Sequence, residues 1–267
     1  MNIKKDRDPL GTRIKENYEN RNRYSLPRRT YTIIRLDGCH FHSYTKNLNK
    51  PFDKGLYEDI DNSIIAIMPQ IQGAVFAYTQ SDEISILLTD FATNTTDAWF
   101  DGNLQKMCSV SSSMMTAEFN RHRLVRACGI ESGDKYKKTK LAYFDSRVFT
   151  IPDRTEVMNY FVWRNQDCSR NSVSMLAQQH FSHGELQSKN TPEMHEMLHK
   201  INVNWATDLS DGEKNGRLIV KEFYYKPMEG HIMKELLGVP RSSWTSTGAW
   251  KFTEDKDKLL QMIPQYE

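Results

Sequence analysis

Two acidic motifs in this chain follow apolar stretches and are spaced so that their carboxylates could meet. Asp37 and Gly38 end a β-branched run, and Asp82 and Glu83 interrupt the apolar segment 76–88. A strand that ends in Asp37, next to a hairpin that carries Asp82 at its turn, would bring both carboxylates to one edge of a sheet. Clustered carboxylates repel each other unless a cation lies between them, and Mg²⁺ prefers such oxygen ligands. The motifs therefore predict a site for in-line phosphoryl transfer assisted by two Mg²⁺ ions.

The pattern of apolar residues predicts the elements that would hold these carboxylates. Apolar residues recur at helical spacing between residues 56 and 68, and apolar runs typical of strands lie on either side. The predicted order is strand, helix, strand, tight turn, strand, helix, strand, which is the ferredoxin-like βαββαβ unit. In that order, the elements are expected at Tyr31–Leu36, Leu56–Met68, Ala74–Tyr78, Ile84–Leu88, Leu104–Asn120 and Tyr143–Ile151. We expect an α+β fold, a polymerase-type palm whose antiparallel sheet has helices on one face.

The remaining segments are expected to be additions to this palm. They are an N-terminal helix at Leu10–Asn22, a long helix at Thr155–Ala177, a helix at Pro192–His199, a hairpin at Arg217–Tyr225 and an irregular tail. Residues 1–180 would form the palm-type catalytic domain with its N-terminal helix, and residues 181–267 a C-terminal extension packed on the palm. We see no strong linker between the two parts, so we expect a single integrated domain.

Composition narrows the class of protein. The chain has 267 residues and a formal net charge of +2, which argues against a polybasic nucleic-acid binder but leaves room for a local basic face. No apolar stretch approaches the ~20 residues that span a bilayer, and the N-terminus has no apolar signal-peptide core. The four cysteines are scattered without a CxxC pair. We therefore expect reduced thiols in a cytoplasmic protein with no membrane contact.

Each acidic motif has an ordinary structural interpretation when it is taken alone. Asp37-Gly38 is a common turn pair, and Asp82-Glu83 could simply form a hairpin turn. Together they favour a functional site, because both end buried-looking strands that one helix separates. Gly38 has no side chain, so its carbonyl oxygen could approach a metal. Ser81 could hydrogen-bond either a phosphate or the backbone of the turn.

Other polar residues near the predicted core elements are candidates for a triphosphate site, which needs fixed cations. His40 and His42 flank Phe41, and each is either a packed imidazole or a hydrogen-bond donor to a triphosphate. Zinc is poorly supported, because no second cluster of ligands matches. The basic run 131–140 is either a solvated loop or a contact with a phosphate backbone. Further candidates, each of which could instead be a solvated side chain, are Lys50, Asp53, Lys106 and Arg147.

In its motifs the chain resembles the tRNA-His guanylyltransferase superfamily. The resemblance covers roughly residues 13–179 and rests on RRTYTIIRLDGCHFHSYT, NKPFD, FAYTQSDEISILL, FDSRVF and DCSRNSVSMLAQ, in the family's order. It implies a palm fold and an enzyme that adds nucleotides to the 5′ end of tRNA, so that the strand grows from 3′ to 5′. A 5′-monophosphate is first activated with ATP or GTP, and the 3′-hydroxyl of a nucleoside triphosphate then attacks the activated end. The resemblance also implies a homotetramer, a dimer of dimers.

The resemblance assigns roles to individual residues. Asp37, the Gly38 carbonyl and Asp82 would hold two Mg²⁺ ions, and Glu83 would support them, so the catalytic candidates are Asp37, Asp82 and Glu83. The candidate nucleotide-binding residues are Asp37, Gly38, Cys39, His40, Phe41, His42, Lys50, Asp53, Ser81, Asp82, Lys106 and Arg147. The candidate RNA contacts are Arg28, Arg29, Lys137, Lys138, Arg170 and Asn171.

Two departures from the family pattern bear on the substrate. Many members have Arg or Lys where this chain has Cys39, so a contact there is either lost or made by the backbone. The branch that adds an extra guanosine to tRNA-His carries the run His-Ile-Asn-Asn-Leu-Tyr-Asn, whereas residues 169–175 here read SRNSVSM. This stretch is similar to the bacterial and archaeal guanylyltransferase-like branch, whose members resemble template-dependent 3′-to-5′ polymerases that repair 5′-truncated tRNAs.

We therefore predict templated tRNA repair ahead of dedicated guanosine addition to tRNA-His. Two hypotheses from other classes remain open at this point. A palm-domain nucleotide cyclase would use the same carboxylates and need no tRNA. A non-catalytic RNA-binding module is the third, and the paired acidic motifs argue against it because carboxylates repel phosphate unless a metal bridges them.

Overall fold

The structure is a computed structural model that describes residues 8–130, 140–227 and 238–266. The strands are β1 (Tyr31–Gly38), β2 (Ala74–Gln80), β3 (Glu83–Leu88), β4 (Phe144–Ile151), β5 (Arg217–Pro227) and β6 (Gly238–Gly248). The α-helices are α1 (Pro9–Ile14), α2 (Phe41–Tyr44), α3 (Lys54–Ile67), α4 (Leu104–Ile130), α5 (Arg154–His180), α6 (His183–Leu186), α7 (Thr191–Lys200), α8 (Trp205–Asp208), α9 (Asp211–Asn215) and α10 (Lys256–Met262).

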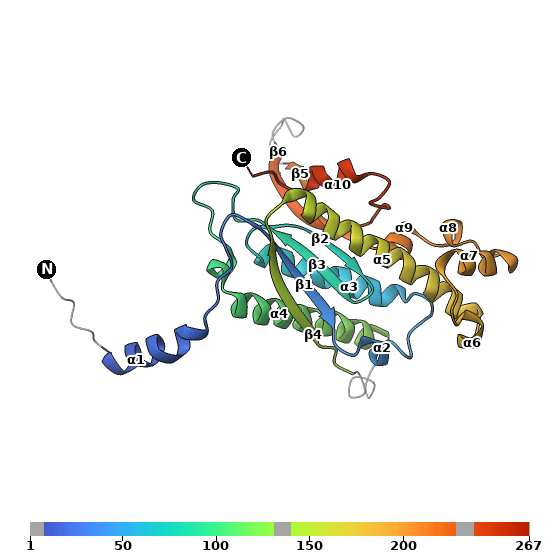
Figure 1. Ribbon diagram of the computed structural model, residues 1–267, viewed down its shortest axis with the longest axis horizontal. Coiled ribbons are helices and arrows are strands. Elements are labelled where there is room, and N and C mark those ends of the chain that lie inside the picture. The colour runs from blue at the N-terminus through green and yellow to red at the C-terminus, as the bar shows by residue number, and fades with distance from the viewer. Residues whose placement is uncertain (1–7, 131–139, 228–237, 267) are drawn as a thin grey trace.

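One antiparallel sheet organises the molecule, with the strand order β4-β1-β3-β2-β5-β6 (Figure 1). The first four strands in this order belong to the β1-α3-β2-β3-α4-β4 unit, so the predicted α+β palm is confirmed. Both β1 and β3 lie inside the sheet: β1 pairs with β3 on one side and with β4 on the other. Their backbone hydrogen bonds are therefore made on both sides within the sheet.

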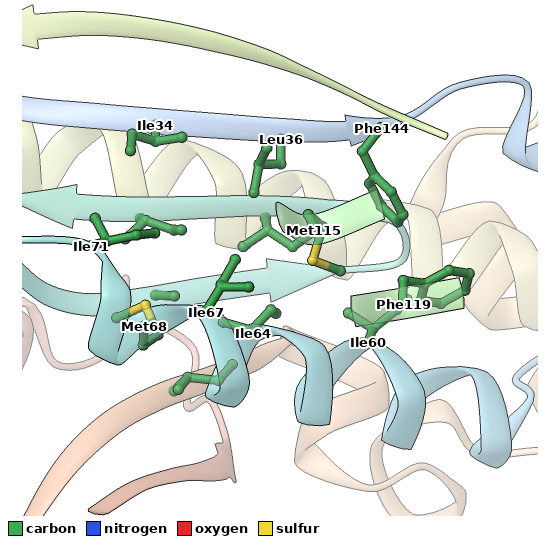
Figure 2. Close-up of a cluster of buried hydrophobic side chains, with 14 of the residues drawn as sticks. Ile34, Leu36, Ile60, Ile64, Ile67, Met68, Ile71, Met115, Phe119 and Phe144 are labelled. Atoms are coloured by element: carbon green, nitrogen blue, oxygen red, sulfur yellow. The ribbon is translucent and has the colours of Figure 1, made fainter. Parts of the chain in front are cut away.

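Helices cover both faces of the sheet, whereas the sequence predicted helices on one face. On the first face, α3 and α4 pack against alternate β1 residues such as Ile34 and Leu36 (Figure 2). On the second face, α5 and α10 pack against Ile33 and its neighbours, with the Phe76 and Phe161 rings 4.8 Å apart. The correction has a physical reason: successive β1 residues point to opposite faces and both sets are apolar, so each face requires a cover.

The C-terminal part of the chain extends the sheet as well as packing on it. Strand β5 pairs with β2, with Ala77 opposite Ile219, and β6 completes a hairpin with β5. The hairpin predicted at Arg217–Tyr225 is wrong in extent, because these residues lie in the single strand β5, which continues the palm sheet and has β6 as its hairpin partner. The expected irregular tail contains α10, whose Leu259 is fully buried against the second face.

Helix α5 is the element that carries residues from the second face toward the carboxylates. Its N-cap is Asp153, whose Oδ1 accepts a hydrogen bond from the Glu156 amide at 3.0 Å. The first half packs on the sheet, and the second half runs past the sheet edge to a small apolar cluster around Val173 and Leu198 (Figure 1). The predicted long helix is therefore confirmed.

The predicted N-terminal helix is present as α1, continues to Asn22 in short π and 3₁₀ segments, and extends away from the sheet (Figure 1). The three cysteine side chains that the structure describes, Cys39, Cys108 and Cys168, are free thiols. Within the described residues, no helix combines the length and apolarity that crossing a membrane requires.

Candidate active site

The two predicted metal-binding carboxylates meet where β1 ends beside the turn between β2 and β3. Leu36 lies opposite Ile84, so the next residue, Asp37, reaches the Ser81-Asp82 turn. Gly38 makes the approach possible: a Cβ at this position would lie 2.7 Å from Asp82 Oδ2 and would overlap the Phe41 ring. The backbone of Gly38 is therefore packed directly against the Asp82 carboxylate.

The local structure of the turn places Asp82 in an environment that disfavours its charge. Ser81 has a φ of 49°, in the left-handed region, and its Oγ donates a hydrogen bond to Asp82 Oδ1 at 2.9 Å. Burial, and to a smaller extent the charges of Asp37 and Glu83, raise the pKa of Asp82 to about 6 although the Ser81 hydrogen bond opposes the shift. Within the described part of the chain, no cationic side chain pairs with Asp37 or Asp82. Both carboxylates are therefore available to an added cation.

Glu83 differs from its neighbour because two guanidinium groups hold it. Arg35 Nη2 donates a hydrogen bond to Glu83 Oε2 at 2.6 Å, and Arg164 Nε lies 2.7 Å from Glu83 Oε1. Glu83 is nearly buried, with 9% of its surface exposed. In the sequence, Glu83 was grouped with the candidate catalytic carboxylates. In the structure its carboxylate pairs with Arg35 and Arg164, which agrees with the supporting role that the resemblance implies.

A cavity of about 190 Å³ opens beside the paired carboxylates. Its walls come from the β2–β3 turn, the start of α3, helix α5 and α9. The lining residues are Asp37, Phe52, Tyr57, Gln80, Ser81, Asp82, Glu83, Arg164, Asp167, Cys168, Asn171, Ser172, Met175 and Glu213. Sequence reasoning missed the wall formed by α5, apart from Asn171. The available signal was Arg164 and Asp167, two charged residues among the aromatic and apolar positions of a long helix.

A second cavity of about 460 Å³ lies on the other side of the turn and shares Ser81 and Asp82 with the first. Two of the predicted cationic or hydrogen-bonding residues, His42 and Lys50, line it. The other lining residues are Phe41, Thr45, Pro51, Met175, Gln178 and Gln179. Asp82 therefore lies between two cavities, as Ser81 and Met175 do, one acidic and one that carries a lysine and a histidine, whereas Asp37 lines only the first.

Several predicted nucleotide-binding residues have structural roles in the same segment. Phe41 packs its ring against Phe119 in the core while its edge reaches the second cavity. Asp53 is the N-cap of α3 and accepts hydrogen bonds from the amides of Leu56 and Asn49. These contacts fix the backbone on either side of Lys50 and Pro51.

The residues that follow Gly38 leave the strand through a tight turn. His40 has a φ of 54°, precedes α2 and is exposed. The Cys39 thiol lies 3.8 Å from Asp145 Oδ2, and burial together with this carboxylate raises the pKa of the thiol. Cys39 is therefore a neutral group at the rim of the site.

Lys106 does not join the site within this chain. It lies near the start of α4, 5.9 Å from the Phe100 ring centroid, whereas Phe119 of the same helix contacts Phe41. The intervening residues span about 20 Å of helix, so Lys106 is at the opposite end of the sheet (Figure 1).

Arg147 lies on the edge strand β4 and is exposed. It is opposite Arg35, as Asp145 is opposite Asp37. Arg147 thus shares the second face with Asp37 but does not line either cavity.

The candidate RNA contacts are placed unevenly. The Arg28 guanidinium and the Arg29 backbone amide both donate hydrogen bonds to Asp90, in the segment after β3 and away from the carboxylates, and the Arg29 guanidinium donates to the Asn94 carbonyl. Arg170 pairs with Asp167 at 3.0 Å and is exposed, and Asn171 lines the first cavity. Lys137 and Lys138 lie outside the described residues. Only Arg170 and Asn171 of this set are thus close to the site in the part of the chain that the structure describes.

The donor atoms available for a metal are two carboxylates and a backbone carbonyl. Among the described side chains, no group of three or more His, Cys, Asp or Glu residues forms a ready metal cluster. Mg²⁺ commonly takes one or two protein carboxylates and completes its shell with water and substrate phosphates. The set formed by Asp37, Asp82 and the Gly38 carbonyl fits that mode of binding.

A palm sheet that brings Asp37 and Asp82 together beside a cavity fits metal-assisted phosphoryl transfer, the chemistry of nucleotidyltransferases and of palm cyclases alike. The sequence profile described as tRNAHis guanylyltransferase, Thg1, matches residues 12–152. The chain belongs to this family and is a nucleotidyltransferase that acts on tRNA.

Solved structures and a curated relative agree with this assignment. A bacterial tRNA(His) guanylyltransferase (Thg1)-like protein in complex with ATP is 40% identical, covers 96% of this chain and 99% of its own, and superposes with a TM-score of 0.80. The same kind of bacterial protein in complex with GTP is 37% identical over 96% and 99% of the two chains, with a TM-score of 0.74. The tRNA(His) guanylyltransferase of Debaryomyces hansenii is 26% identical over 73% of this chain and 75% of its own.

Proposed function

We propose that this protein adds nucleotides to the 5′ end of tRNA in the 3′-to-5′ direction, directed by a template, and so repairs 5′-truncated tRNAs. Its similarity to bacterial Thg1-like proteins, 40% identity over 96% of the chain, exceeds the 26% identity over 73% to the guanylyltransferase of Debaryomyces hansenii. The protein is thus more similar to the Thg1-like proteins than to this dedicated guanylyltransferase.

The observation that carries the proposal is the position of residues 169–175, the stretch that departs from the guanosine-adding branch. Asn171, Ser172 and Met175 line the cavity next to Asp37 and Asp82. Ser169 is turned into the protein, where its Oγ hydrogen-bonds the Asn165 carbonyl and Asn215 Oδ1. The departure therefore changes a wall of the reaction cavity, where it can alter which end of which tRNA is accepted.

In this proposal, the paired carboxylates would bind metal ions and the second cavity would bind a triphosphate. Asp37, Asp82 and the Gly38 carbonyl would hold two Mg²⁺ ions, which when bound neutralise phosphate charge and lower the barrier to in-line displacement. His42 and Lys50 would bind a triphosphate in the second cavity. ATP or GTP would serve as the activating nucleotide, as the complexes of the bacterial relatives suggest. Activation would transfer the nucleotidyl group to the 5′-monophosphate and release pyrophosphate. The 3′-hydroxyl of a nucleoside triphosphate would then attack the 5′-phosphorus, and the activating AMP or GMP would leave.

Two further parts of the proposal concern location and assembly: the first is supported by the scattered cysteines, and the second by the family resemblance. The protein would act in the cytoplasm, and it would assemble as a homotetramer, a dimer of dimers. Light scattering coupled to size-exclusion chromatography measures the mass directly, and a monomer at the working concentration of the enzyme would contradict the tetramer.

Dedicated addition of guanosine to tRNA-His is the second candidate function, and the description of the matching family favours it. The two functions differ in substrate. Repair requires a truncated tRNA and a template base opposite the incoming nucleotide. Guanosine addition requires full-length tRNA-His and is confined to one nucleotide.

The deciding experiment offers both substrates to the wild-type protein with Mg²⁺, ATP and each labelled nucleoside triphosphate. One substrate is 5′-monophosphorylated tRNA-His, and the other is a non-His tRNA that lacks its first nucleotide. The Asp37→Asn and Asp82→Asn variants serve as inactive controls. Asp257→Asn removes an exposed carboxylate on α10 and is the matched control.

We expect efficient, template-matched extension of the truncated tRNA by the wild-type protein and by Asp257→Asn, and no extension by the other two variants. A preference for guanosine on full-length tRNA-His would overturn the repair assignment. Full activity of both active-site variants would overturn the carboxylate assignment. A reaction without tRNA, analysed for cyclic nucleotide, tests the cyclase hypothesis at the same time.

A further inference from the structure

A buried arginine links the helix that lines the reaction cavity to the turn that carries Asp82. Only 5% of the surface of Arg164 is exposed. Its Nε lies 2.7 Å from Glu83 Oε1, and its Nη2 donates a hydrogen bond to Asp167 Oδ2 at 2.6 Å. The guanidinium carbon lies 4.2 Å from the centroid of the Trp163 ring. A buried guanidinium is tolerated only when its charge is paired. The hydrogen bond to Asp167 and the contact with the Trp163 ring fix its orientation, and the contact with Glu83 is an ion pair without hydrogen-bond geometry.

The contacts of Arg164 continue through Glu83 to the strand that carries Asp37. Arg35, two residues before Asp37, donates a hydrogen bond from Nη2 to Glu83 Oε2 at 2.6 Å. Glu83 follows Asp82 directly, and Asp167 lines the first cavity. The series Arg35–Glu83–Arg164–Asp167 therefore joins β1, the β2–β3 turn and α5. In this series, Arg164 is the member that contacts both the sheet and the helix.

Arg164 occupies the point where α5 passes the edge of the sheet. Before it, Phe161 packs on Phe76, and Tyr160 hydrogen-bonds Ser85 at 2.8 Å. After it, the helix packs on α7 and α9 and presents the cavity wall from Asp167 to Met175. The apolar contacts thus fix the first half of α5 on the sheet. Arg164 fixes the start of the second half relative to the catalytic turn.

We propose that Arg164 is a positioning residue, which holds the α5 wall at a set distance from the Asp82 carboxylate. This inference rests on the proposed function, because it concerns the same site. It assigns Glu83 to the same task, as the anion that Arg164 and Arg35 share. Arg164 borders the cavity, but its guanidinium is engaged by Glu83 and Asp167, so we expect that its loss lowers the rate of nucleotidyl transfer and changes nucleotide affinity little.

The test compares Arg164→Met and Arg164→Lys with a matched control. The control is Arg121→Met. Arg121 on α4 pairs with Glu118, three residues away, just as Arg164 pairs with Asp167, but the Arg121 side chain is exposed. A displacement of about 1 Å at a reacting centre costs about 100-fold in rate. We expect Arg164→Met to lower kcat by about 100-fold and to leave KM for the nucleoside triphosphate within about threefold. Arg164→Lys keeps the charge without the planar fork and should lie between it and the wild type.

A second readout does not depend on activity. Hydrogen–deuterium exchange of the amides at residues 80–83 should quicken in Arg164→Met and remain unchanged in Arg121→Met. Glu83→Gln should lower kcat similarly, and the double variant Glu83→Gln with Arg164→Met should be no slower than the worse single variant, because both changes break one link. If Arg164→Met fails to fold, the lysine variant and the Glu83→Gln variant carry the test.

Three results would overturn the inference. A folded Arg164→Met protein with kcat within about threefold of the wild type would do so, as would multiplicative losses in the double variant or a loss confined to KM. All variants are measured on whichever tRNA the wild-type protein extends. If the wild-type protein prefers full-length tRNA-His, templated repair is refuted. The positioning role of Arg164 is then still tested, by comparing the variants on that tRNA.

Discussion

Gly38 is the position where a single methyl group should separate the catalytic carboxylates from their working geometry. A Cβ added there would lie 2.7 Å from Asp82 Oδ2, which is 0.7 Å inside the 3.4 Å at which ordinary van der Waals contact begins. It would also overlap the ring of Phe41. Gly38 does not have a positive φ, so Gly38→Ala acts through these contacts and not through backbone strain.

The size of the effect follows from the displacement that the methyl group forces. The Asp82 carboxylate or the Gly38 backbone must move by at least 0.7 Å, and a misplacement of about 1 Å at a reacting centre costs about 100-fold in rate. Overpacking of this kind costs about 1–3 kcal/mol of stability, so the variant should remain folded. We expect kcat/KM for nucleotide addition to fall by about 100-fold.

The assay measures initial rates of nucleotide addition to tRNA, together with a thermal unfolding curve for each protein. Gly184→Ala is the control, because a Cβ at Gly184 would meet no atom within 4 Å. Gly184 lies in α6, where alanine favours helix, so the control should keep wild-type activity. A folded Gly38→Ala enzyme with kcat/KM within about threefold of the wild type would refute the steric argument.

Two further predictions concern stability. Because burial raises the pKa of Asp82 to about 6, protonation of its carboxylate stabilises the metal-free fold at low pH, and this stabilisation is lost as the pH rises through 6. In EDTA, Asp82→Asn should therefore increase the free energy of unfolding by roughly 1–3 kcal/mol at high pH and by much less near the ordinary pKa of aspartate. Urea unfolding at the two pH values measures this difference. An equal change in the free energy of unfolding at both pH values would contradict the prediction. Asp53→Ala removes the N-cap of α3 and should lower the free energy of unfolding by about 1 kcal/mol. Asp53→Asn keeps a side-chain oxygen that can cap the helix, so it should lose much less. Equal losses in the two variants would show that the hydrogen-bonded cap is not the cause.

Local patterns in the sequence were sufficient for the central unit of the fold. The hydrophobic periodicity and the flanking turn residues within about a dozen positions predict six elements, which are the strands β1, β2 and β3 and the helices α3, α4 and α5. The pairing of β5 with β2 and the cover provided by α10 were not readable in this way. Such contacts join distant segments: Asp61 and Arg217, for example, form a buried ion pair 156 positions apart. No local pattern encodes which distant segment completes a sheet.

The same distinction applies to the site. Asp37, Gly38, Ser81 and Asp82 were found because strand ends and turns are local features, and the structure brings them together. The wall formed by α5 was missed because its charged residues acquire their partners only on folding. Lys106 lies away from these residues within the chain, because matching a residue to a family motif gives its order along the chain and no position in space.

The addition of β5 and β6 has a consequence for the mobility of the catalytic strands. With β4 at one end and β6 at the other, strands β1, β3 and β2 all have hydrogen-bonded neighbours on both sides. Segments that open with little free energy are drawn from edges and loops, whereas interior strands open only when much of the domain unfolds. We therefore expect the strands that flank Asp37 and Asp82 to exchange their amide hydrogens slowly. If the protein accepts more than one tRNA end, as proposed, the α5 wall and the cavity rims are the parts free to adapt around this centre.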